Sequence, residues 1–111
     1  MSLEDRFTAA LLDTYEVAKE HKYHATYFLK MLNERGGVET ARYLLADHET
    51  QAGLFRLWEL HLLKYSVEAI VLRKEFMSLF SDEEIAEAKR RLDEFEFTDY
   101  YYLINDGYYE G

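Results

Sequence analysis

Glu20, His21 and His24 are the residues of this chain whose types and spacing come nearest to a metal-binding or catalytic site. Imidazoles three residues apart on a helix can share one metal ion, and an adjacent carboxylate would complete the site. The three residues fall, however, where the sequence predicts a junction between helices, and no second Glu-x-x-His unit exists to build a dinuclear centre. A solvated turn is the preferred interpretation, and a small metal-dependent enzyme is the alternative.

Other catalytic chemistry has little support in the sequence. The chain contains no cysteine, which excludes disulfides, thiolate metal sites and a cysteine nucleophile. A Gly-x-Ser-x-Gly elbow is absent, and Gly36-Gly37 lacks the Lys-Ser/Thr pair of a phosphate-binding loop. Ser66 and Ser81 are better explained as helix N-caps. We therefore predict no catalytic residue, no cofactor and no metal ion.

The last nineteen residues, 93–111, have a composition unlike the rest of the chain. They carry six acidic and seven aromatic residues and no Lys or Arg, whereas the preceding residues hold all 13 basic residues and 16 of the 22 acidic ones. Most of the formal charge of −9 therefore belongs to this end. Tyrosine offers a large contact area at little rotamer entropy, so the segment suits protein contacts. The candidate interaction surface consists of Tyr100, Tyr101, Tyr102, Tyr108 and Tyr109.

Three interpretations of this acidic tail, residues 98–111, are open. It packs on its own helical domain, it joins a homodimer interface, or it is a mobile acidic peptide that engages a basic partner. Because the tail directly follows the basic stretch Lys89–Arg91, self-docking or dimer contact is preferred over a free acidic peptide. We expect a protein partner or a homodimer.

Basic side chains form two clusters, and they define a candidate basic patch: Arg73, Lys74, Lys89, Arg90 and Arg91. Such a patch could face phosphate, as in a nucleic-acid-associated accessory protein, which is a second alternative function. The charge of −9 argues against nucleic acid, since non-specific affinity depends on neutralising phosphates. The preferred interpretation is that these residues balance nearby glutamates on a helix surface, with Glu87 four residues before Arg91 in the order that favours an ion pair.

The totals predict one globular helical domain. A length of 111 residues, 49% hydrophobic content and no proline suit a single domain of uninterrupted helices. Neither a signal peptide nor an apolar stretch long enough to span a membrane is present, so a bacterial or archaeal cytoplasm is the expected location.

Apolar spacing predicts six helices. The first covers about residues 3–20, the second begins at Ala25 and ends at Gly36-Gly37, and the third runs from Val38 until residues 47–50. The fourth contains Leu54, Phe55, Leu57 and Trp58, with Leu62 left open as a further member, and Phe55 and Trp58 are expected in the core. The fifth begins after Ser66, and the sixth begins at the capping box Ser81–Glu84.

Several stretches resemble the sequence pattern of a bacterial helical domain family of unknown function. The matching stretches are TYEVAKE (14–20), GGVETARYLL (36–45), GLFRLWE (53–59) and SVEAIVLRKEFMSLFSDEEIAEAKRRL (66–92). The resemblance implies a compact helical module, sometimes part of longer proteins, and no activity. It does not include the tyrosine-rich tail.

The sequence thus predicts an all-α fold, a compact bundle of five to six short helices (residues 1–97) followed by the acidic tail, irregular or partly extended. The expected function is a non-catalytic protein-interaction module acting through a surface that includes the tail.

Overall fold

The computed structural model describes residues 1–47 and 52–95, and all of the regular secondary structure in this part of the chain is helical. The predicted all-α fold is confirmed, while the tail lies outside the described residues. Five α-helices and two 3₁₀ turns follow one another: α1 (Leu3–Glu20), α2 (Thr26–Ala46), α3 (Ala52–Glu59), η1 (Leu63–Tyr65), α4 (Val67–Val71), η2 (Met77–Leu79) and α5 (Asp82–Asp93).

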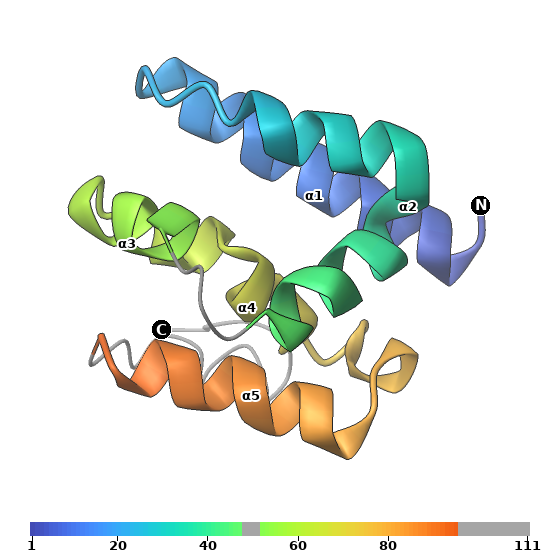
Figure 1. Cartoon of the computed structure of the whole chain (residues 1–111). Coiled ribbons are helices and arrows are strands. Elements are labelled where there is room, and N and C mark those ends of the chain that lie inside the picture. The colour runs from blue at the N-terminus through green and yellow to red at the C-terminus, as the bar shows by residue number, and fades with distance from the viewer. Residues whose placement is uncertain (48–51, 96–111) are drawn as a thin grey trace.

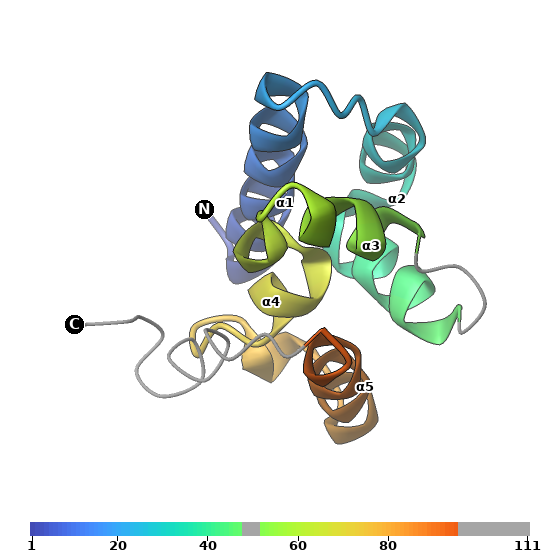
Figure 2. The same ribbon diagram turned by 90° about the vertical axis from the view of Figure 1, so that its left-hand side faces the viewer.

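The short helix α4 lies at the centre of the domain. The hairpin of α1 and α2 packs on one side of it and α5 on the other (Figures 1 and 2). All five residues of α4 are buried. Phe7 of α1 contacts Phe76 and Phe80 edge to face, with ring centroids 5.2 and 5.1 Å apart. Burial of these apolar groups joins the hairpin to the second half of the chain.

Serine side chains start three of the helices. Ser2 Oγ accepts from the Asp5 amide at α1. Ser66 Oγ accepts from the Ala69 amide over 3.1 Å at α4. At α5, Ser81 Oγ accepts from the Glu84 amide over 3.1 Å, and the Ser81 amide donates to Glu84 Oε1 over 2.8 Å. The predicted cap at Ser66 and the capping box at Ser81 are confirmed.

Two helices end on residues other than glycine in the left-handed conformation. Lys22 has a φ of 65° after α1, and His61 has a φ of 61° after α3. The next amide in each case donates back five residues, Tyr23 to Ala18 over 2.9 Å and Leu62 to Leu57 over 2.8 Å. This is the Schellman pattern. Leu62, which the sequence left open as a member of this helix, lies outside it, because α3 ends at Glu59 and the chain turns at His61.

The predicted helix end at Gly36-Gly37 is a kink within α2. Gly36 alone leaves the helical region, with φ 80° and ψ 170°, and the helix then resumes. Gly37 lies against α1, where its amide donates to Thr8 Oγ1 over 2.9 Å. A Cβ at Gly37 would lie 2.7 Å from Thr8 Cα, so the missing side chain permits this close approach. α2 therefore consists of two helical segments that meet at Gly36, the position where the sequence predicts one helix to end and the next to begin.

Candidate functional site

The helix α3 is apolar on two faces, and only one of them is buried. Leu54 and Leu57 face the core and are 5% and 7% exposed, whereas Phe55 and Trp58 remain 49% and 43% exposed. The prediction that Phe55 and Trp58 belong to the core is wrong. The neighbouring helices cover only the leucine face, and the sequence of a helix that is apolar on two faces does not reveal which face will be covered.

Phe55, Trp58 and Phe95 form an aromatic cluster. The ring centroids of Phe55 and Trp58 are 5.5 Å apart, and Phe95 lies 5.7 Å from Trp58 and 6.5 Å from Phe55. Phe95 lies two residues after α5, whose last turn lies below α3 in Figure 1. The cluster thus joins two segments that are far apart in the sequence, and its outer rings face solvent. We refer to these three residues as the aromatic cluster.

Charged groups beside the aromatic cluster are paired with one another. Arg56 Nη1 lies 3.6 Å from Glu59 Oε1, and its Cζ lies 5.9 Å from the Tyr23 ring centroid. Arg90 forms ion pairs with Glu87 and Glu94 on α5. These two arginines therefore already have acidic partners.

The basic patch expected from the sequence is divided in the structure. Arg91 is 1% exposed and cannot belong to a surface patch, which corrects that part of the prediction. Arg90 is exposed and ion-paired, and Lys89 lies next to it on α5. Arg73 and Lys74 precede η2. The expected Glu87–Arg91 pair is present, with Arg91 Nε 2.6 Å from Glu87 Oε2, but the arginine side chain is buried.

Arg91 uses all five of its N–H groups. Besides the bond to Glu87, Nη1 donates to the Leu44 carbonyl over 3.0 Å and to Glu68 Oε2 over 3.2 Å. Nη2 donates to the carbonyls of Leu45 and Asp47 over 3.1 and 2.9 Å. Sequence reasoning missed this buried network, because nothing in the spacing of Glu68 and Arg91 indicates that α4 and α5 meet there.

The two carboxylates around Arg91 have opposite pKa shifts. Desolvation by burial raises the pKa of Glu68, although Arg91 opposes this effect. The hydrogen bond from Arg90, helped by Arg91, lowers the pKa of Glu87 from 4.5 to about 2. The negative charge of the buried Glu68 is therefore incompletely compensated, whereas Glu87 is well stabilised as an anion.

The structure places the candidate metal ligands on the surface. Glu20, His21 and His24 are exposed at the turn after α1, and His21 Nδ1 lies 3.0 Å from the Val17 carbonyl. Across residues 1–47 and 52–95, no three His, Asp or Glu side chains gather in a way that could hold a metal ion. The candidate interaction residues Tyr100, Tyr101, Tyr102, Tyr108 and Tyr109 lie outside the described residues.

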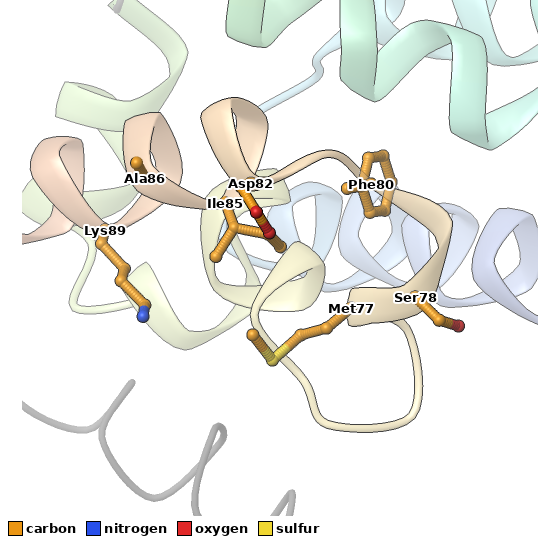
Figure 3. Close-up of a pocket in the computed structure, with 7 residues that line it drawn as sticks. All are labelled: Met77, Ser78, Phe80, Asp82, Ile85, Ala86 and Lys89. Atoms are coloured by element: carbon orange, nitrogen blue, oxygen red, sulfur yellow. The ribbon is translucent and has the colours of Figure 1, made fainter.

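A depression lies between η2 and α5, with seven lining residues (Figure 3). Lys89 extends its ammonium group toward the open side, while Ser78 points away from the other labelled side chains. Met77 comes from η2, and Asp82 and Ile85 come from the first turn of α5. These side chains do not converge on a common point, so the depression does not resemble a built ligand site.

None of the helices in the described part of the chain combines the length and apolar character needed to cross a membrane. No protein-family model, curated protein sequence or solved structure matches this chain.

Proposed function

We propose that this chain is a non-catalytic protein-interaction module whose aromatic cluster binds an apolar, basic segment of another protein. The observation that carries the proposal is the exposure of Phe55 and Trp58, at 49% and 43%, in contact with Phe95. Large aromatic side chains gathered on a surface are typical of protein contact sites, because they bury much area with few rotatable bonds.

Charge supports a basic partner. The aromatic cluster includes Phe95, and residues 93–111 contain six acids and no Lys or Arg. Arg56 of α3 and Arg90 of α5 already pair with glutamates. A segment that brings its own Lys or Arg would therefore meet an excess of negative charge, which favours association. A second copy would bring a further charge of −9.

The buried and paired arginines of α5 weaken the case for docking of the tail on its own domain. That docking depends on Lys89–Arg91 being available to the acidic residues. Since Arg91 is buried and Arg90 is ion-paired, much of the attraction is already used within the domain. We therefore favour a separate basic partner, with self-association as the competing outcome. The bacterial cytoplasmic location expected from the sequence belongs to the same proposal.

Selection of peptides on the full chain tests this function. Random 12-residue peptides displayed on phage should yield binders enriched in Lys or Arg together with Leu, Phe or Trp. Trp58 is the only tryptophan, so its emission should shift to shorter wavelength when a binder covers it. Replacing Phe55 and Trp58 by alanine should weaken peptide binding at least about tenfold, which is the scale of a lost aromatic anchor. Because this double variant has no tryptophan, its peptide affinity is measured by calorimetry.

Tyr27→Ala is the matched control, because Tyr27 is an exposed aromatic residue of α2 outside the cluster. It should leave peptide affinity unchanged. Selected peptides without basic residues, or equal binding by the double variant, would contradict the proposal. Light scattering adds a separate outcome: a dimer that the double variant converts to monomer would identify a second copy as the partner.

A further inference from the structure

A cavity of about 550 Å³ lies between α1, both ends of α2, and α3, with α4 and α5 at its base. Tyr15, Tyr23, Phe28 and Leu57 contribute to its mostly apolar wall, which extends to Glu68 and Arg91. The volume falls within the range of roughly 300–1,000 Å³ that small-molecule sites occupy. Apolar walls with a few convergent polar groups are the usual character of such sites. The cavity shares no lining residue with the aromatic cluster, so a ligand bound there would be independent of the proposed function.

The charged end of the cavity is acidic in character. Arg91 lines it, but all five of its N–H groups already donate to protein oxygens, so an anionic ligand would find no unused donor there. Glu68 and Glu87 share this one guanidinium. Burial raises the pKa of Glu68 despite the arginine, which means that its negative charge lacks full compensation. An added cation would supply that compensation.

The aromatic part of the wall suits the apolar body of a ligand. Tyr23 and Tyr43 both line the cavity, and each already has an arginine over its ring. Arg56 Cζ lies 5.9 Å from the Tyr23 centroid, and Arg35 Cζ lies 4.5 Å from the Tyr43 centroid. Because an arginine already lies over each ring, the tyrosines supply apolar surface for the body of a ligand. The buried carboxylate of Glu68 is the group in the wall that can accept hydrogen bonds from an ammonium group.

We propose that this cavity binds a small organic cation, an amine on an aromatic or apolar body, with its ammonium group at Glu68 and its body between the tyrosine rings. The ammonium N–H groups donate to the carboxylate, and the apolar body replaces water along the wall. A neutral analogue loses the charge-assisted bond, and a carboxylate analogue is repelled by Glu68.

Three probes of similar size separate these contributions: phenethylamine, 2-phenylethanol and phenylacetate. Titrations of the full chain, followed by amide chemical shifts, should show binding of the amine, with resonances of α1, α2 and α4 moving. The affinity of the alcohol should be at least about tenfold lower than that of the amine, which is the scale of one hydrogen bond to a charged group. Phenylacetate should not bind. Equal binding by all three probes, or no amine binding at millimolar concentration, would overturn the proposal.

Glu68→Gln tests the position of the ammonium group. Its affinity for phenethylamine should fall to that for 2-phenylethanol, while the alcohol binds as before, which also shows that the cavity is intact. Glu75→Gln removes an exposed acid outside the cavity and should change neither affinity. If Glu68→Gln still prefers the amine over the alcohol, the cation does not lie at Glu68 and the proposal is wrong.

Discussion

Arg91 of α5 donates a hydrogen bond over 3.1 Å to the carbonyl of Leu45 in α2, 46 residues earlier in the chain. The last turn of α2 contains no basic residue of its own. The final carbonyls of a helix lack partners within it and carry partial negative charge. By also bonding the Leu44 and Asp47 carbonyls, Arg91 provides from another helix the cationic cap that α2 lacks.

Replacing Arg91 by Met should destabilise the fold strongly. The substitution leaves Glu68 without its buried cation and three carbonyl groups without this donor. Loss of one member of a buried ion pair costs about 3–5 kcal/mol. Urea unfolding of the variant should show this loss, which is large relative to the stability of a small domain.

Arg90→Met is the matched control for that measurement. Arg90 is the exposed neighbour on the same helix, and its ion pairs with Glu87 and Glu94 lie at the surface. Its urea midpoint should fall by much less than that of Arg91→Met, because Arg90 is half exposed and its loss leaves no buried charge without a partner. Similar midpoints for the two variants would contradict a special role for Arg91.

Glu87 should stabilise the fold at neutral pH and lose this effect in acid. Its pKa is about 2 in the folded chain against 4.5 for the free group, so the folded state favours the anion. The stabilisation is present above about pH 4.5 and disappears as the pH falls toward 2. Glu87→Gln should therefore unfold earlier than the parent chain at pH 7, and the difference should narrow steadily between pH 5 and pH 2.

Glu68 should show the opposite dependence on pH. Its pKa is raised in the folded chain, so folding favours the protonated form and stability decreases as the pH rises through that value. Glu68→Gln, which carries no charge, should be at least as stable as the parent chain at pH 7 and lose any advantage below pH 4.5. A large loss of stability at pH 7 would show that the Glu68–Arg91 pair outweighs desolvation. Melting temperatures of the parent chain and of Glu68→Gln between pH 4 and pH 7 distinguish these two outcomes.

Gly37→Ala should be destabilising through a collision with α1. The new Cβ would lie 2.7 Å from Thr8 Cα, a backbone atom that cannot rotate away. Overpacking of this kind costs about 1–3 kcal/mol.

Gly53→Ala is the comparison in α3, since its Cβ would meet only Tyr23 Oη, at an ordinary 3.5 Å. That change should raise stability by about 0.5–1 kcal/mol through helix propensity. Denaturant midpoints that move in the same direction would refute this explanation.

Lys22→Gly should stabilise the chain. Lys22 has a φ of 65°, where an L side chain is strained by roughly 1–2 kcal/mol and glycine is not. After the entropy of the unfolded glycine is included, a gain of about 0.5 kcal/mol should remain. His61→Gly should act likewise after α3. Lys19→Gly, the same replacement inside α1, should instead lower the melting temperature. Calorimetry of the three variants therefore compares glycine at a left-handed position with glycine at a helical one.

The sequence by itself determined the local features of this protein. Ser66 and Ser81 cap helices as predicted, and the bounds of α1 agree with its apolar spacing. These features depend on residues within one helical turn of each other, so their chemistry is readable along the chain. The sequence also shows the excess of acidic and aromatic residues near its end, and the interpretation of that tail stays a prediction.

Only the tertiary structure decided which side chains are buried. The sequence predicts Phe55 and Trp58 in the core and Arg91 at the surface, yet the aromatic pair is exposed and Arg91 is enclosed. For the aromatic pair the reason is that α3 is apolar on two faces, and burial depends on which face the other helices cover. Arg91 is buried because α2, α4 and Glu87 together satisfy its five donors, and bonds between residues up to 47 positions apart leave no local pattern in the sequence.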